Sequence, residues 1–156
     1  MTVLFLTCCF FLSFPQESSQ RRASSSSSQL LKNPHAGPAA SSSVQLAGLC
    51  ENIRDGIQNG SLESFAPSFE QNVFVNISTG EGGYVSSSQA ISIIRSVFRD
   101  RKSISFAFTL TDFSASTPYA TGRWTYRRMG SQSSSQIYVS FVRQESGWKI
   151  SQFNIY

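Results

Sequence analysis

The sequence predicts an α+β fold, with helices packed in the concave face of a curved, mostly antiparallel sheet. In the first half of the domain, apolar side chains recur at the spacing of amphipathic helices. Over residues 103–156 they alternate with polar ones, which is typical of consecutive half-buried strands. An antiparallel meander must cover its apolar face, and the upstream helices offer the only apolar surface for it.

The first half combines helices with one short strand. Helical spacing of apolar residues predicts an amphipathic helix over residues 44–58, which Asn59 and Gly60 end. Ser61 is placed to cap a second, short helix. Apolar and polar side chains then alternate over residues 72–78, which predicts a strand.

A third helix follows a mobile turn at residues 79–83. Ser86, with Gln89 three residues later, forms a capping box, and the helix is expected to reach about Arg101. Its expected buried stripe is Ala90, Ile91, Ile94, Val97 and Phe98. Positive charge gathers near its C-terminus, which is typical of a solvated helix end; contact with an acidic surface or a phosphate is the alternative. This basic cluster comprises Arg95, Arg99, Arg101 and Lys102.

Four strands complete the domain. Ser, Thr, Gly and Pro mark the turns between them at 116–118, 130–135 and 145–147. In the last strand the apolar residues change from even to odd positions near Ser151 and Gln152, which predicts a β-bulge. The expected strands are 103–112, with Ile104, Phe106, Phe108 and Leu110 facing inward, then 119–129, 136–143 and 147–156.

The charge of the domain is small. The chain has 156 residues, with 13 Lys and Arg against 9 Asp and Glu, a formal net charge of +4. Arg21, Arg22 and Lys32 precede the domain, which leaves the domain itself at about +2. Nucleic-acid binding requires a clustered basic face, so we expect no nucleic-acid partner.

Cysteine and histidine are scarce. Cys50 is the only cysteine within residues 44–156, and the only histidine, His35, precedes them. No disulfide within the domain and no Cys/His metal set is therefore available, and we expect neither a metal nor a cofactor.

Two segments precede the domain. Residues 1–15 are an apolar leader, too short to span a bilayer comfortably and of the length of a secretory signal, which predicts export to the periplasm, the cell envelope or the medium. The alternatives are lipidation at Cys8 or Cys9, or a start site placed too far downstream. Membrane contact is expected only through this leader, if it is uncleaved or lipidated. Residues 16–43 are Ser-rich and predict a disordered linker to the domain at 44–156.

Three stretches resemble one known superfamily. The segment 59–65 after the first helix, the approach to the third helix at 83–86, and the closing segment 147–153 are similar to the nuclear transport factor 2-like superfamily, which has a cystatin-like cone fold. Within it, the chain is most similar to small bacterial secreted domains of unknown function. The resemblance implies a fold but no particular activity, because members include dehydratases, isomerases, polyketide cyclases and transport adaptors.

Enzymes of this superfamily place a carboxylate inside the cone, often with His or Tyr. Asp112 is the only acidic residue on the four expected strands, because Glu145 lies in a turn, and the alternation before Asp112 would turn it inward. A strand-end carboxylate is its ordinary interpretation, and a pocket acid acting with Tyr126 is the alternative. No histidine is available to pair with it, and the resemblance transfers no catalytic residue to this chain.

Large aromatic side chains are candidates to line a hollow for a small apolar ligand. The same residues are also the usual filling of a small core. They are Phe65, Phe69, Phe106, Phe108, Trp124, Tyr126, Phe141 and Trp148.

The opposite face of the sheet is semi-apolar and carries Tyr and Arg, which interfaces favour. Superfamily members often dimerise through such a face, so a homodimer or partner contact is expected here, with a solvated face as the alternative. The candidate residues, called the outer row below, are Tyr119, Thr121, Arg123, Thr125, Arg127 and Tyr138.

The sequence therefore predicts an exported, non-catalytic domain that binds a small apolar ligand or a protein partner. Two alternatives remain open: an isomerase or dehydratase-type enzyme that uses Asp112, and a structural dimeric module of the cell envelope.

Overall fold

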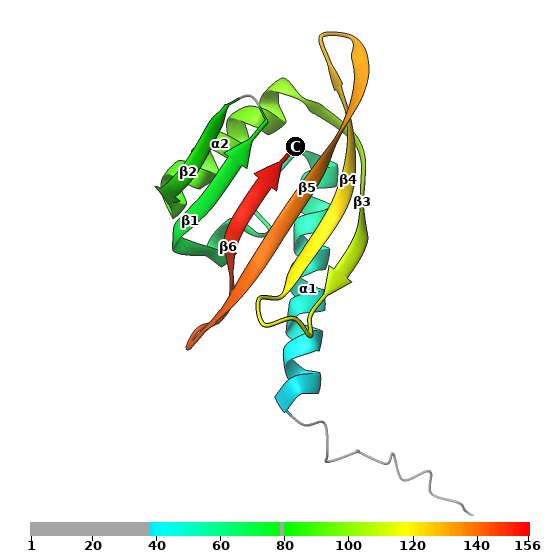
Figure 1. Cartoon of the computed structure of the whole chain (residues 1–156). Helices are drawn as coiled ribbons and strands as arrows, with labels where there is room; N and C mark the ends of the chain where they lie inside the picture. The colour runs from blue at the N-terminus through cyan, green and yellow to red at the C-terminus, as the bar shows by residue number, and fades with distance from the viewer. Residues whose placement is uncertain (1–37, 79) are drawn as a thin grey trace, which may run out of the picture. The chain divides into compact units, whose positions relative to one another are not determined.

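The computed structural model describes residues 38–78 and 80–156, which form helices and one six-stranded sheet (Figure 1). The strand order is β2-β1-β6-β5-β4-β3, and only β1 and β6 are parallel. The predicted α+β class and mostly antiparallel sheet are confirmed. The elements are α1 Pro38–Asn59, η1 Ala66–Ser68, β1 Phe69–Ile77, β2 Glu81–Ser86, α2 Ser87–Asp100, β3 Lys102–Asp112, β4 Tyr119–Arg128, β5 Ser131–Gln144 and β6 Gly147–Ile155.

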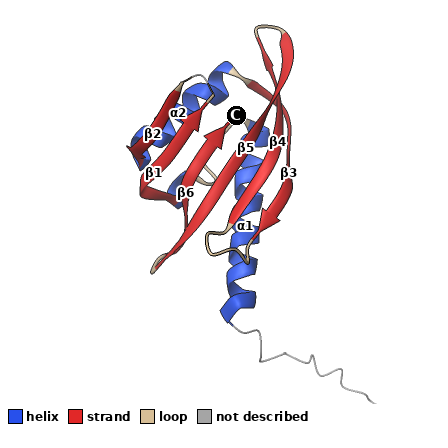
Figure 2. Ribbon diagram, in the orientation of Figure 1, coloured by secondary structure: helices blue, strands red, loops and turns tan. Residues whose placement is uncertain are grey.

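Both α-helices lie on the same side of the sheet (Figure 2), with α1 against β3 and β6 and α2 mainly against β1 and β2. Helix α1 begins at Pro38, so the prediction of a disordered linker is wrong for residues 38–43. Proline is favoured at a first helical position, where its missing N–H costs nothing, and the Ala and Ser residues after it allow the helix to continue. Gly60, with φ of 66°, ends the helix as predicted.

The start of α2 is as the sequence predicts. Ser86 Oγ accepts a hydrogen bond from the Gln89 N–H at 3.3 Å, and Gln89 Oε1 accepts one from the Ser86 N–H at 3.0 Å. The short helix expected from Ser61 is absent among the described residues, which form a turn and η1 there. Pro67 lies inside that segment and has no backbone N–H to donate to a longer helix.

Strands β1, β2 and β5 differ from the prediction, and β1 begins at Phe69 rather than at residue 72. Strand β2 occupies much of the expected mobile turn and pairs with β1. Its glycines interrupt the alternation of apolar and polar side chains by which a strand is recognised in a sequence. Strand β5 begins at Ser131 rather than at 136. Met129 and Gly130 alone make the turn, with φ of 49° and 83°, which suits a two-residue hairpin turn.

The bulge predicted in the last strand is confirmed. Ser140 of β5 pairs with Gln152 of β6, whereas the next residue, Phe141, pairs with Ile150. Ser151 therefore has no partner in the ladder, and the strand changes phase at this point.

Strand β3 contains two bulges that the sequence did not predict. Ile104 and Thr109 have no partner in the β3–β4 ladder. Each of these extra residues reverses the phase of the strand, so the side chains after it face the opposite side of the sheet. Ile104 is consequently 44% exposed and Leu110 51% exposed, so their predicted inward orientation is wrong. Phe106, between the two bulges, is buried as expected.

The core lies between the helices and the sheet. It includes Leu46, Ile53, Ile57, Val73, Ala90, Ile94, Ile137, Val139, Ile150, Phe153 and Ile155.

The predicted leader, the linker up to residue 37, and Cys8 and Cys9 lie outside the described residues. No helix of the described residues is long and apolar enough to cross a bilayer.

Candidate functional site

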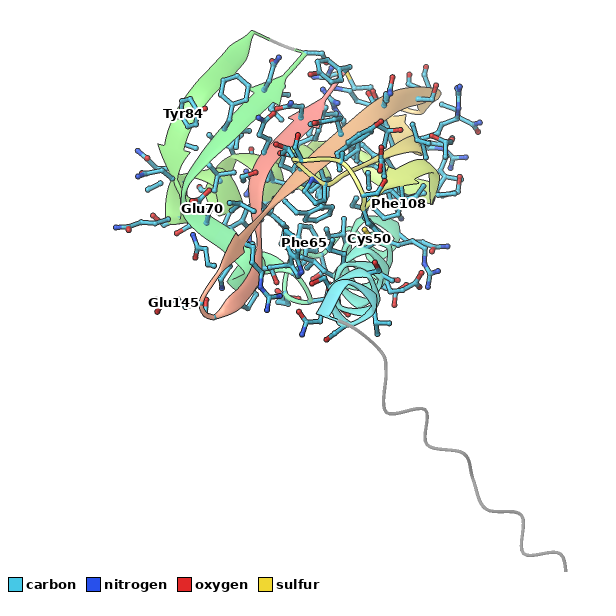
Figure 3. All side chains as sticks on the ribbon, turned by 60° about the horizontal axis from the view of Figure 1, so that its bottom comes forward. Cys50, Phe65, Glu70, Tyr84, Phe108 and Glu145 are labelled. Atoms are coloured by element: carbon cyan, nitrogen blue, oxygen red, sulfur yellow. The ribbon has the colours of Figure 1, made fainter. Side chains whose placement is uncertain are left out.

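The aromatic side chains predicted to line a ligand cavity mostly pack against one another. The ring centroids of Phe65 and Phe69 lie 6.0 Å apart, and those of Trp124 and Tyr126 lie 4.6 Å apart. Phe65 lies between α1 and the sheet (Figure 3). These rings fill the core. Four hollows are well defined on the described residues, and six of the eight predicted aromatic residues line none of them: Phe65, Phe69, Phe106, Phe108, Trp124 and Tyr126.

Phe141 and Trp148 border a small open hollow of about 250 Å³. The Arg143 guanidinium lies 5.6 Å from the Trp148 ring centroid and also donates to Gln45 Oε1 on α1 at 2.6 Å. These contacts join α1 to the β5–β6 hairpin, so the surroundings of Trp148 have a structural role.

The bulge at Thr109 reverses the strand phase before Asp112, which lies at the end of β3 and borders an open hollow of about 670 Å³ with Ser42 and Ser43 of α1. Its carboxylate accepts hydrogen bonds from the Ser114 hydroxyl and from the N–H groups of Ser114 and Ala115. These bonds, the Ser114 hydroxyl first, lower the pKa of Asp112. Asp112 is a charged turn cap, as in its ordinary interpretation.

Asp112 and Tyr126 also lie at opposite ends of the same strand pair. Asp112 pairs with Tyr119, whereas Tyr126 pairs with Ser103. Seven residues of β4 separate the two pairs, so at about 3.3 Å per residue the two ends are roughly 23 Å apart. The alternative in which Asp112 acts with Tyr126 as a catalytic pair is therefore wrong.

The outer row lies on the face of the sheet opposite the helices. Thr121 pairs with Tyr138, and the rings of Tyr119 and Tyr138 stack with centroids 5.7 Å apart. Burial, followed by the nearby charges of Tyr119 and Tyr156, raises the pKa of Tyr138. The common face of the row agrees with the predicted alternation, and its contact with a second molecule stays a prediction.

Cys50 lies on the buried side of α1 (Figure 3). Burial first, and then the neighbouring Glu51 charge, raise the pKa of its thiol to about 12. The protonated thiol is a poor nucleophile and metal ligand at neutral pH. In the parts of the chain that the structure describes, no group of three metal-ligating side chains occurs.

The largest of the four hollows, about 850 Å³, lies beside the C-terminal half of α2. Ser92 and Ser96 border it in one row, and Ile93 and Val97 in another, because residues four apart lie on one side of a helix. Ile77, at the end of β1, adds to its apolar side. Its charged side chains are Arg99, Asp100, Arg101 and Arg128. We call this site the basic hollow.

Arg101 has the most unusual environment in the basic hollow. It is only 4% exposed, and its guanidinium lies 5.2 Å from the centroid of the Tyr126 ring. Its Nη1 is closed off from solvent and has no hydrogen-bond partner. Among the side chains that the structure describes, no carboxylate lies within ion-pair distance of it. A buried charge is stable only when it is paired, so Arg101 lacks a counter-ion.

The other charges of the basic hollow are only partly compensated. Arg128 Nε donates to Asp100 Oδ2 at 2.8 Å, and both side chains are nearly half exposed, at 44% and 48%. Arg99 Nη2 lies 3.5 Å from Ser96 Oγ. Three arginines face one aspartate, so the lining carries a net charge of +2. The arrangement favours an anion.

Sequence reasoning found part of this site. The basic cluster at the end of α2 contains Arg99 and Arg101, but its members Arg95 and Lys102 do not line the basic hollow. Arg128 was missed because it comes from β4, which the pairing of Lys102 with Arg127 brings to the α2–β3 junction. No pattern in the sequence signals that Arg101 is buried.

A family model described as "Domain of unknown function (DUF4783)" matches residues 50–156. The chain belongs to this family. A solved DUF4783 family protein from Bacteroides uniformis ATCC 8492 is similar, with 13% identity and a TM-score of 0.60, over 67% of this chain and 93% of that one. Another, from Bacteroides fragilis YCH46, has 15% identity and a TM-score of 0.58, over 67% and 93% of the two chains.

The fold of this DUF4783 domain extends beyond the family. An NTF-2-like protein of unknown function from Shewanella oneidensis MR-1 matches with 12% identity and a TM-score of 0.54, over 72% of this chain and 97% of that one. Identities this low show the fold alone, and this fold is the one that the resemblance to the nuclear transport factor 2-like superfamily implied. No curated protein matches the chain.

Proposed function

We propose that this DUF4783 domain is a non-catalytic binding domain for a small anionic molecule, which it holds in the basic hollow. The observation that carries the proposal is Arg101, a buried cation with a free N–H and no described counter-ion. A bound anion supplies the missing charge, and it supplies the missing acceptor once the guanidinium turns to bring Nη1 to the hollow. Hydrogen bonds between such charged groups are roughly twice as strong as neutral ones.

This ligand differs from the apolar one expected from the sequence. The aromatic residues that were to enclose an apolar ligand contact one another, whereas the basic hollow combines cations with an apolar wall. Export and contact through the outer row are compatible with the proposal, which requires neither.

The lining of the basic hollow favours binding over proton transfer. Arginine stays protonated in proteins, so the three arginines offer charge and hydrogen bonds but no acid or base. Asp100, the one carboxylate in the lining, is paired with Arg128.

Nuclear magnetic resonance titration tests the proposal. Sodium acetate and sodium phosphate are added at constant ionic strength, and the side-chain Nε–H signals of arginine are followed. We expect the Arg101 signal, and the Arg99 and Arg128 signals from the same hollow, to shift saturably for at least one of the two anions. Arg101→Met should abolish the shifts of the Arg99 and Arg128 signals and leave the stability of the free protein unchanged or higher by about 1 kcal/mol, because a buried unpaired charge is removed.

The matched control is Arg95→Met. Arg95 is exposed on the same helix and does not line the basic hollow, so this variant should keep the response of the wild type. An unchanged response in Arg101→Met, or a wild type that responds to neither anion, would contradict the proposal.

A further inference from the structure

One wall of the basic hollow is apolar and only partly covered. Ile93 and Val97 are half buried on α2, whereas Ile94 and Phe98, one position further along the helix, are buried in the core. Ile77 of β1 borders the same space. A simple inorganic ion would leave this wall facing water, and a ligand that covers it gains about 25 cal/mol for each Å² of apolar surface removed from water.

The charges of the basic hollow call for a single negative group. Arg128 already has Asp100 as its partner, and Arg99 reaches toward solvent and Ser96. Only Arg101 is both buried and without a counter-ion. A guanidinium presents a planar fork of N–H donors, which matches the two oxygens of a carboxylate.

The apolar wall has a definite length. From Ile93 to Arg101 is eight steps along the chain, which corresponds to roughly 12 Å along a helix axis at 1.5 Å per residue. Ser92 and Ser96 run beside this wall, and their small side chains leave room above it. The charge therefore lies at one end of an elongated apolar strip.

We infer that the ligand is a monoanionic amphiphile, namely a free alkyl or aryl monocarboxylate. Its carboxylate pairs with Arg101, and its apolar part lies along Ile93, Val97 and Ile77. The inference rests on the proposed anion-binding function and adds the class of molecule. A dianionic phosphate monoester gains little at this site, because the second cation without a carboxylate partner, Arg99, is exposed and its charge is screened by water.

Calorimetric titration of the full-length protein with a homologous series tests the inference. The probes are acetate, butanoate, hexanoate, octanoate and decanoate below their micellar concentrations, with octanol and octyl phosphate for comparison. We expect the affinity to rise about twofold to fourfold per methylene, as for a chain that is partly to fully buried. The gain should level off once the chain exceeds the wall. Octanol should not bind measurably, and octyl phosphate should bind no tighter than octanoate.

Variants of the wall separate its contribution from that of the charge. Val97→Thr preserves shape and Ile93→Thr shortens the side chain; both remove apolar surface, so both should flatten the dependence on chain length while acetate binding is kept. Ile91→Thr is the control, because Ile91 is half buried on the same helix but does not line the basic hollow. Arg101→Met should lose every member of the series.

The outcomes distinguish this inference from the proposed function. If acetate binds and octanoate binds no tighter, the inference is overturned while the anion-binding function stands. Tighter binding of octyl phosphate, or binding only to vesicles of phosphatidylglycerol and phosphatidylcholine, also overturns it. If none of the anions binds, both proposals fail.

Discussion

Two regions of the domain bury their side chains with opposite results. Beneath α1, Phe65, Phe69 and Phe153 contact one another with ring centroids 6.0 to 6.1 Å apart, and Ile53 and Ile57 are fully buried. Beside the end of α2, the basic hollow contains Arg101, which is almost as buried but lacks a counter-ion.

Under the proposed function, burial in the first region serves stability and burial in the second serves binding. Apolar burial beneath α1 is completed within the chain, because each ring exchanges contact with water for contact with another ring. Burial of Arg101 is unfavourable without a counter-ion, which the proposed anion would supply. Substitutions beneath α1 should therefore change stability, and substitutions in the basic hollow should change binding.

The largest loss of stability is expected for Phe153→Ala, which breaks the aromatic cluster beneath α1. Phe153 is fully buried and contacts both Phe65 and Phe69. We expect the free energy of unfolding to fall by about 3–5 kcal/mol, measured by urea denaturation. Val44→Ala, at a side chain that is 73% exposed, is the control and should change it by less than about 0.5 kcal/mol. If the alanine variant does not fold, Phe153→Leu is measured in its place. A decrease in its free energy of unfolding of less than about 0.5 kcal/mol would contradict close packing around Phe153.

Two glycines of α1 should respond in opposite directions to alanine. A Cβ on Gly56 would lie 2.5 Å from Phe65 Cε1 and 2.6 Å from the Ser61 carbonyl oxygen, so Gly56→Ala should cost about 1–3 kcal/mol. A Cβ on Gly48 meets nothing within 4 Å, and Gly48→Ala should stabilise the helix by about 0.5–1 kcal/mol. Thermal unfolding of the pair measures both effects, and equal shifts would show that Phe65 does not pack against Gly56.

The Cys50 thiol should make stability depend on pH in the alkaline range. Burial raises its pKa from 9.0 to about 12, so the folded protein keeps a proton that the unfolded chain loses near pH 9. Its contribution is complete below pH 9 and decreases as the pH rises from 9 toward 12. In a Cys8→Ser, Cys9→Ser background, unfolding at pH 10 should show a loss of about 1 kcal/mol relative to pH 8. Cys50→Ala should remove this loss, and an unchanged pH dependence in that variant would refute the assignment.

The smallest effect on stability is expected for Asp100→Asn, which alters the basic hollow. It removes the exposed ion pair with Arg128, which is worth about 0–1 kcal/mol, and raises the net charge of the lining from +2 to +3. We expect anion affinity to rise about threefold, measured by the same titration with acetate. Asp55→Asn, on the exposed face of α1, should leave the affinity unchanged. Weaker acetate binding in Asp100→Asn would mean that Asp100 holds Arg128 in the orientation that binds.

Local signals in the sequence were sufficient for several elements. The capping box of Ser86 and Gln89, the helix end at Gly60 and the bulge at Ser151 depend on residues close together in the chain, and all three are confirmed. Strand β2 and the bulges at Ile104 and Thr109 were missed, because the pairing strand sets the register there. The bulge at Thr109 also reverses the strand phase before Asp112.

The sequence by itself determined the α+β class, the apolar residues available for a core, and a cluster of arginines at the end of α2. The tertiary structure decided which of these arginines is buried, that Arg128 joins them from β4, and that the aromatic rings fill their own space. The physical reason is that periodicity and capping act over a few residues, whereas the energy of a charge depends on its depth from solvent and its distance to other charges. Those two quantities are set by segments far apart in the chain.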